Sequence, residues 1–230
     1  MITKRNYTWL TYVPQSSLLL FILLNLIAMY LYPGNTYHNH LTNKYIFTQN
    51  FLSDLGRTHV FSGKINFFSS QLFNTSLIIA GIVFIMFYYN VKSILFLKNK
   101  KWLSYIGSWF GILGGICLAG VGLTPANLYL SYHILFANWL FRFMLFASIF
   151  YSYIIFKHPI FESKYAIGYI IFTITILFYI IISELGPSPK HSVFALTLQV
   201  VSQKIILFIF LISVYIQSLG IQKFFKYEPI

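Results

Sequence analysis

Long apolar stretches alternate with short polar segments along most of the chain. Because the hydrocarbon core of a bilayer is about 30 Å thick, about twenty residues of α-helix are needed to cross it. Six stretches reach that length, over about 14–32, 68–91, 103–123, 131–156, 165–185 and 193–220. The pattern predicts an all-α fold: a polytopic membrane helical bundle of about six transmembrane spans, forming a single integral membrane domain over 1–230.

The amino-acid composition excludes a water-soluble domain. Hydrophobic residues make up 58% of the chain and charged residues only 9%, whereas soluble domains carry about a quarter charged residues. Cys117 is the single cysteine, so a scaffold held by internal disulfides is excluded as well.

The first apolar stretch follows Lys4 and Arg5, which is also the arrangement at the start of a secretory signal peptide. Its apolar run continues to Leu31, and the following segment LYPGNTYHN offers no small-residue cleavage site. We therefore interpret this stretch as a retained first span.

Lysine and arginine are unevenly divided between the two sides of the predicted bundle. The net charge is +12, but the basic residues are scattered between apolar runs, so nucleic acid is not an expected partner. Basic residues are enriched in cytoplasmic segments of membrane proteins, which predicts that the N and C termini are both cytoplasmic. The cytoplasmic segments would hold Lys4, Arg5, Lys92, Lys98, Lys100, Lys101, Lys157, Lys164, Lys223 and Lys226, and the outer loops Lys44, Arg57, Lys64 and Lys190.

The outer loop over 33–67 is much longer than the other connections. Loops longer than about 15 residues are usually functional or disordered. This loop contains the apolar segments YIFTQNFL and HVFSGKINFF. We therefore expect it to fold back onto the outer face of the bundle.

The third span carries small residues at four-residue spacing, at Gly107, Gly111, Gly115 and Ala119. Such a stripe allows two helices to approach closely. The expected use is packing inside the chain, and the alternatives are a dimer interface or a pore.

Ionisable and strongly polar residues inside the predicted spans lie toward the outer side. Counting 1.5 Å per residue from the cytoplasmic end places Arg142 at roughly 21 Å, Lys204 at 24 Å, Asn74 at 25 Å and Glu184 at 28 Å. Charged residues within a span are costly and are candidates for function. The predicted functional region is therefore the outer half of the membrane.

Several residues at the outer surface belong to the same region. His133 and His191 lie at the starts of the fourth and sixth spans, and Asp54, the only aspartate, lies in the long loop beside Arg57 and His59. An unpaired buried charge is very costly. We therefore expect Asp54 to pack onto the helix ends near His133, with pairing to Arg57 as the alternative.

These residues also have structural interpretations. Lys204 can extend its side chain to the outer interface, and Arg142 can form a bridge with Glu184. His133 and His191 can be interfacial residues without ligands. By height, however, Glu184 would lie several ångströms above Arg142 and Lys204, which would leave Arg142 without a counter-charge and free to recruit an anion.

The polar residues Gln199, Ser202 and Gln203 share one face of the last span. Polar faces in membrane helices usually form hydrogen bonds with neighbouring helices. We expect the same here.

A zinc site would need His59, His133 and His191 with Asp54 or Glu184 as ligands. No pair of these residues has short metal-ligand spacing, and nearby Arg and Lys would repel a cation. No metal and no cofactor is therefore expected.

Three segments together resemble a known family. The run NFLSDLGRT (50–58), then FFSSQLFNTSLIIAGI, then GVGLTPANLYLSYHILF are similar to the bacterial membrane family called domain of unknown function 998. The resemblance implies a location in a bacterial inner (cytoplasmic) membrane, and it assigns no activity. It singles out Ser53, Asp54, Gly56, Asn74, Pro125 and His133.

The leading functional hypothesis is a protein that binds or modifies a lipid headgroup from the outer leaflet. Arg142 and Lys204 would hold an anionic headgroup, and Asp54 and His133 would orient it or serve as base and acid. Whether the protein is an enzyme stays open. The alternative is a non-catalytic structural or accessory membrane subunit, with a homo-oligomer or a partner membrane protein as its assembly. The remaining candidate binding residues are Ser53, Arg57, Asn74, Glu184 and His191.

Overall fold

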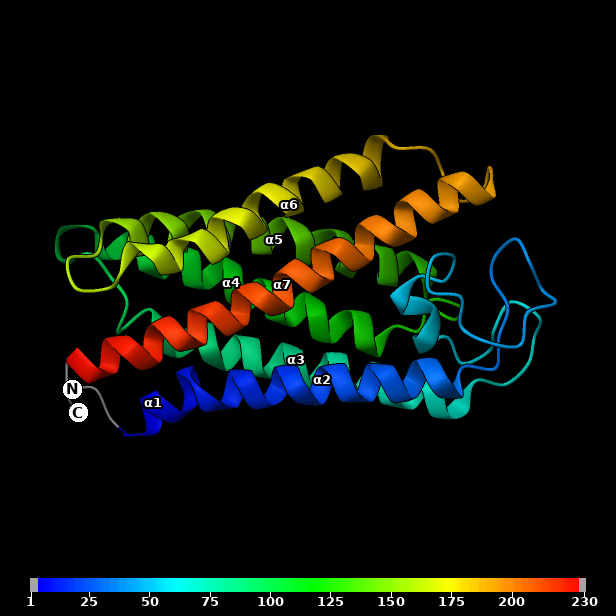
Figure 1. Ribbon diagram of the computed structural model, residues 1–230, viewed down its shortest axis with the longest axis horizontal. Helices are drawn as coiled ribbons and strands as arrows, with labels where there is room; N and C mark the ends of the chain where they lie inside the picture. The colour runs from blue at the N-terminus through cyan, green and yellow to red at the C-terminus, as the bar shows by residue number, and fades with distance from the viewer. Residues whose placement is uncertain (1–3, 228–230) are drawn as a thin grey trace.

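A computed structural model describes residues 4–227 of the chain, without the side chains of residues 4, 5 and 227. The described chain is all-helical, with 75% helix and no strands. Within it, six helices are long and apolar enough to cross a membrane (Figure 1). They are α2 (Tyr12–Leu31), preceded by the short α1 (Lys4–Leu10), α3 (Phe67–Val91), α4 (Lys101–Leu123), α5 (Leu130–Lys157), α6 (Ala166–Leu185) and α7 (Val193–Tyr227).

The helices begin and end within two residues of the predicted ranges, except that α7 continues to Tyr227. Proline accounts for several of these ends, because it disfavours helical geometry in the residue before it and cannot donate a backbone hydrogen bond. Pro33, Pro125, Pro159 and Pro187 each follow a helix end by two residues.

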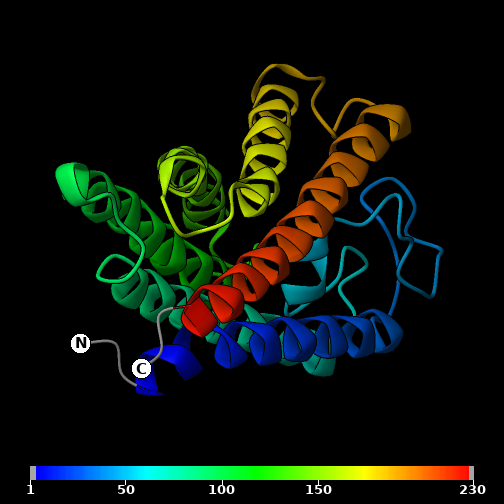
Figure 2. The ribbon, with the colours of Figure 1, turned by 60° about the vertical axis from the view of Figure 1, so that its left-hand side comes forward.

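The six long helices form a ring. Each packs against the next one in the chain, and α7 returns to contact α2, α1 and the loop helix η1 (Leu52–Gly56). Figure 2 shows this arrangement from an oblique direction, with α7 passing across the opening between α6 and α2. The two helices α2 and α7 lie close where the chain begins and ends, and they diverge toward the other end of the bundle (Figure 1).

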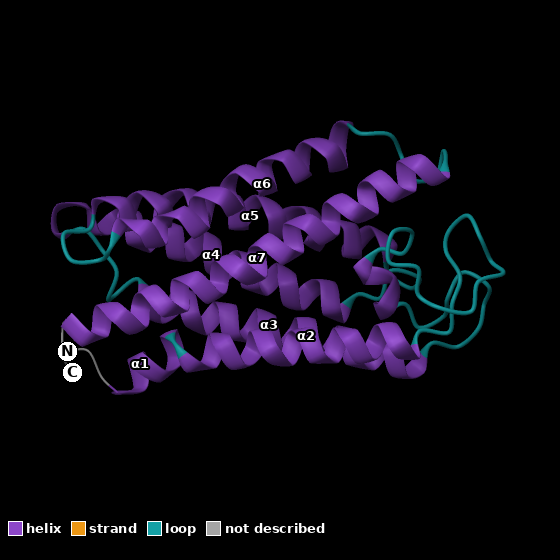
Figure 3. Ribbon diagram, in the orientation of Figure 1, coloured by secondary structure: helices purple, strands orange, loops and turns teal. Residues whose placement is uncertain are grey.

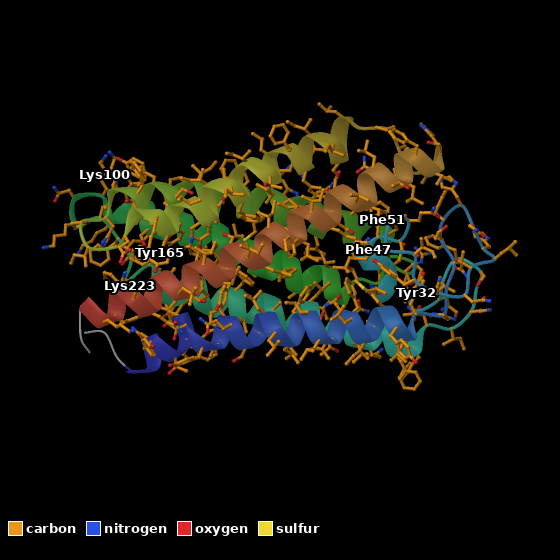
Figure 4. All side chains as sticks on the ribbon, in the orientation of Figure 1. Tyr32, Phe47, Phe51, Lys100, Tyr165 and Lys223 are labelled. Carbon is orange, nitrogen blue, oxygen red and sulfur yellow. The ribbon has the colours of Figure 1, made fainter. Side chains whose placement is uncertain are left out.

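The bundle has two different ends. The loops over 32–66, 124–129 and 186–192 gather at one end, which we call the loop end (Figure 3). The other end, which we call the terminal end, holds both ends of the described chain and the loops over 92–100 and 158–165. Figure 4 shows Lys100 and Lys223 at the terminal end, and Tyr32, Phe47 and Phe51 at the loop end. Lysine is thus concentrated at the terminal end, as the sequence predicted.

The long loop folds back onto the helices, as expected. Leu52 and Leu55 of η1 are buried, and η1 lies between α3 and α7. Farther along the loop, His59 and Ile65 form an isolated antiparallel bridge, and the Asn66 side chain donates to the backbone oxygens of Leu55 and Arg57 at 2.9 and 2.8 Å. The loop is therefore an ordered cover over the loop end of the ring.

The glycine stripe of α4 serves packing within the chain. A Cβ at Gly111 would lie 2.3 Å from the ring of Tyr88 on α3, and one at Gly115 would lie 2.9 Å from the backbone oxygen of Gly81. Gly107 faces Tyr151 on α5 in the same way, at 3.2 Å. These contacts confirm internal packing as the use of the stripe.

Candidate functional site

The ring of helices surrounds a partly open cavity of about 560 Å³. Side chains of α2, α3, α4, α5, α6 and α7 line it, and residues of the long loop line it at the loop end. Its middle part is apolar, because the helices direct their buried apolar side chains toward one another. Typical lining residues there are Leu77, Phe84, Met144, Phe172, Ile206 and Phe210.

The loop end of the cavity is polar and charged. Three of its residues, Ser53, Asp54 and Arg57, come from the loop, and His133 comes from the first turn of α5. Gln199 and Gln203 of α7 and Lys190 of the preceding loop also line the cavity. The structure thus brings both proposed catalytic residues and two of the proposed binding residues to one end of one cavity.

Asp54 is buried, with 5% of its surface exposed. Its Oδ2 accepts hydrogen bonds from the backbone N–H of Phe51 at 2.9 Å and from Nδ2 of Asn50 at 3.2 Å, and so caps the start of η1. Burial raises the pKa of Asp54 from 3.8 to about 6, against the lowering effects of the Asn50 hydrogen bond and the nearby Arg57 charge. Its carboxyl group is therefore able to exchange a proton near neutral pH.

Arg57 is the cation of the loop that lines the cavity. Its guanidinium carbon lies 4.2 Å from the centre of the Phe61 ring, and its Nε is buried without a hydrogen-bond partner. Among the ion pairs of residues 4–227, none involves Arg57. The Asp54 carboxylate is close enough to influence Arg57 electrostatically, yet the two side chains do not form the direct pair that was the alternative expectation.

His133 is buried, and its Nδ1 lies 2.7 Å from the backbone oxygen of Thr124. Because a carbonyl oxygen only accepts, Nδ1 carries the hydrogen, and Nε2 of the neutral ring is left as an acceptor. Asp54 and His133 both line the loop end of the cavity, and the contact expected between them stays a prediction.

Lys204 is used inside the protein rather than in the cavity lining. Its Nζ donates to the backbone oxygen of Asn50 at 2.6 Å and lies 4.8 and 5.4 Å from the ring centres of Phe47 and Tyr45. The neighbouring Gln203 accepts from the backbone N–H of Leu52 at 2.8 Å. Together these contacts fix α7 to the loop, and Lys204 is 8% exposed rather than extended to the interface.

Arg142 forms an ion pair and a hydrogen bond with Glu184, which joins α5 to α6. The expectation that Glu184 lies too far above Arg142 is therefore wrong. Height counted along straight helices ignores their tilt and the length of the arginine side chain, which together bring the two groups into contact. Neither residue lines the cavity, and the pair is partly exposed on the outside of the ring.

Asn74 and His191 also lie away from the cavity lining. Asn74 Nδ2 donates to the backbone oxygen of Gly56 at 3.1 Å, so this side chain joins α3 to η1. His191 is exposed in the loop before α7. Within residues 4–227 no three His, Cys, Asp or Glu side chains gather as a metal site would require.

Sequence reasoning missed the residues that hold the loop in place. Asn50 accepts from Ile46 N–H at 2.9 Å, donates to the Asn35 oxygen at 2.9 Å and contacts Asp54. Asn127 exchanges two hydrogen bonds with Thr58, at 2.8 and 2.9 Å. Asparagines within apolar loop segments were the available signal, since a buried amide requires hydrogen-bond partners.

Comparison with protein-family models, with curated proteins and with solved structures finds no match to the chain.

Proposed function

We propose that this protein is an integral membrane protein that holds a membrane lipid in the central cavity, with the lipid headgroup at the loop end. The observation that carries the proposal is the polarity of the cavity, which is charged at the loop end and apolar through its middle part, with Ser17, Ser213 and Gln217 in the lining toward the terminal end. A lipid is likewise polar at its headgroup and apolar along its chain. The cavity volume of about 560 Å³ is within the range of ~300–1,000 Å³ typical of ligand sites.

In this proposal the loop end faces outward from the cytoplasm. The concentration of lysine at the terminal end supports that orientation, because basic residues favour the cytoplasmic side. The headgroup then lies in the outer half of the membrane. The same proposal places the protein in a bacterial inner membrane. It also includes the family that the long loop and its flanking spans resemble.

Asp54 and His133 give the site a means of moving protons at the headgroup. A carboxyl group with a pKa of about 6 and an imidazole acceptor are suited to act as acid and base near neutral pH. The protein would then both bind the lipid and modify its headgroup at the same site.

The test is native mass spectrometry of the full chain released from lipid nanodiscs. Leu207 lines the cavity, whereas Phe208, the next residue of α7, is 64% exposed on the outside of the ring. Leu207→Trp is expected to fill the cavity and remove co-purified lipid, while Phe208→Trp retains it. Equal lipid occupancy in the two variants would contradict the proposal.

The second candidate is a structural or accessory subunit without a ligand. The Arg142–Glu184 bridge favours it, because a cation that was expected to bind an anion joins two helices instead. In that case no lipid is retained at stoichiometric level by the wild-type chain or by either variant.

A further inference from the structure

We infer that the occupant of the cavity is a lipid with an extended hydrocarbon chain and an anionic group, a carboxylate or a phosphate, anchored by Arg57. This inference rests on the proposed function and specifies the class of lipid. It transfers the anion-binding role from Arg142, where sequence reasoning placed it, to a loop residue.

The dimensions of the cavity suit an extended hydrocarbon chain. On α3 its lining extends from Phe73 to Tyr88, and on α6 from Tyr169 to Ser183. At 1.5 Å per residue these runs are about 22 Å long. A cavity of about 560 Å³ that extends over this length is long and narrow, as an extended hydrocarbon chain requires.

The charges at the polar end favour an anion. The lining contains two cations, Arg57 and Lys190, against one carboxylate, Asp54. Lys204, although outside the lining, adds a third positive charge close to Asp54. The polar end is therefore net positive even with Asp54 ionised.

Arg57 is the cation best placed to hold the anionic group. The other arginine with a described side chain, Arg142, already has the Glu184 carboxylate as its partner. Arg57 has a buried Nε without a hydrogen-bond partner. Its contact with the Phe61 ring leaves the edge of the guanidinium, with its N–H groups, available to an acceptor. A carboxylate or phosphate oxygen satisfies those donors by charge-assisted hydrogen bonds.

The polar end offers a further donor beside Arg57. Ser53, Asp54, Arg57 and His133 all line this end of the cavity. The Ser53 hydroxyl is able to donate to an anionic oxygen, whereas Nε2 of the neutral His133 ring is an acceptor and bonds only to a protonated acid.

The experiment uses the full chain in phosphatidylcholine nanodiscs and a photoactivatable diazirine analogue of palmitate. Crosslinks are expected on the apolar lining of α3 and α7. Unlabelled palmitate and hexadecyl phosphate are expected to compete about ten- to a hundredfold better than hexadecanol, since loss of a charge-assisted hydrogen bond costs about that factor. Whichever acid competes better identifies the carboxylate or the phosphate as the natural group.

Arg57→Gln is expected to remove the preference for the two acids over hexadecanol, and Arg57→Lys to restore part of it. The matched control is Lys64→Gln, which removes a charge from an exposed position of the same loop. The preference of the wild-type chain tests the charge inference even if Arg57→Gln does not fold.

The outcomes separate the two proposals. If the probe crosslinks in the cavity but all three competitors act equally, or if Arg57→Gln keeps the preference for acids, the inference of an anionic group held by Arg57 is overturned and lipid binding stands. If no probe crosslinks to the lining, and Leu207→Trp changes no lipid occupancy, the proposed function itself fails.

Discussion

At the scale of single residues, Asp54 is expected to make the stability of the protein depend on pH. A buried carboxyl group with hydrogen bonds from one backbone N–H and one asparagine amide costs free energy when it ionises, because it loses water that these hydrogen bonds only partly replace. Its pKa of about 6 expresses that cost.

Ionisation of Asp54 is expected to destabilise the folded state. The folded-state pKa lies above the unfolded value of 3.8, so the folded protein binds the proton more tightly than the unfolded chain. The Asp54 contribution to stability is therefore greatest below about pH 4 and is lost as the pH rises through about 6. The difference between the folded and unfolded pKa of Asp54 corresponds to about 3 kcal/mol between those limits.

We expect Asp54→Asn to remove this part of the pH dependence. The wild-type chain should melt at a higher temperature at pH 5 than at pH 7.5, and the difference should become smaller in Asp54→Asn. Thermal unfolding in detergent at the two pH values measures it, with Lys64→Gln as the exposed control. An unchanged difference in Asp54→Asn would show that other groups cause the pH dependence.

At the scale of elements, the packing of α3 against α4 depends on residues without side chains. Gly81 on α3 and Gly115 on α4 place backbone against backbone, and Gly111 makes room for the Tyr88 ring. Close approach of this kind replaces the hydrophobic effect as a source of stability between helices in a membrane.

Gly111→Ala tests this packing. The added methyl would lie 2.3 Å from Tyr88, whose ring is itself buried beside Tyr151. Displacement of these rings is expected to cost about 1–3 kcal/mol. Ile116→Val, at a 46% exposed position of the same helix, should change stability by less than about 0.5 kcal/mol. Equal melting temperatures of the two variants would rule out a tight α3–α4 contact at Gly111.

The attachment of the loop to α7 is the other element-scale feature that matters for function. Gln203 and Lys204 each bind a backbone group just before or at the start of η1. The positions of Asp54 and Arg57 in the cavity therefore depend on contacts made by α7 about 150 residues later in the chain. The polar face predicted on this span bonds the loop through Gln203 and the end of α6 through Gln199, whose amide donates to the Ile182 oxygen at 2.7 Å.

At the scale of the whole molecule, the two ends of the bundle differ in charge and in covering. The terminal end carries an ion-pair network in which Glu162 contacts Lys164 at 2.7 Å and Lys223 at 2.5 Å, and these lysines lower the pKa of Glu162. The loop end carries the ordered cover and the polar end of the cavity. This asymmetry is the basis for the proposed orientation.

Cysteine labelling with a membrane-impermeant maleimide tests the orientation in whole cells. Leu41→Cys, at an 89% exposed position of the long loop, should be labelled from outside, and Lys100→Cys only after the membrane is opened. The native Cys117 is buried and provides the unlabelled background. Labelling of Lys100→Cys in intact cells would reverse the proposed orientation.

The sequence by itself determined the six long helices, their ends except that of α7, the separation of basic residues and the return of the long loop. Each of these depends on counts along one dimension: the length of an apolar run, the position of a proline, or the number of lysines between runs. These counts do not depend on how the helices are rotated or tilted against one another.

Only the tertiary structure decided how the polar residues are paired. Arg142 and Glu184 meet outside the ring, Lys204 binds the loop backbone, and Arg57 is left without an ion-pair partner in the described chain. Such choices depend on helix rotation, helix tilt and side-chain reach over a few ångströms. Height along an ideal helix does not contain that information, because hydrogen bonds and ion pairs form only at contact distance.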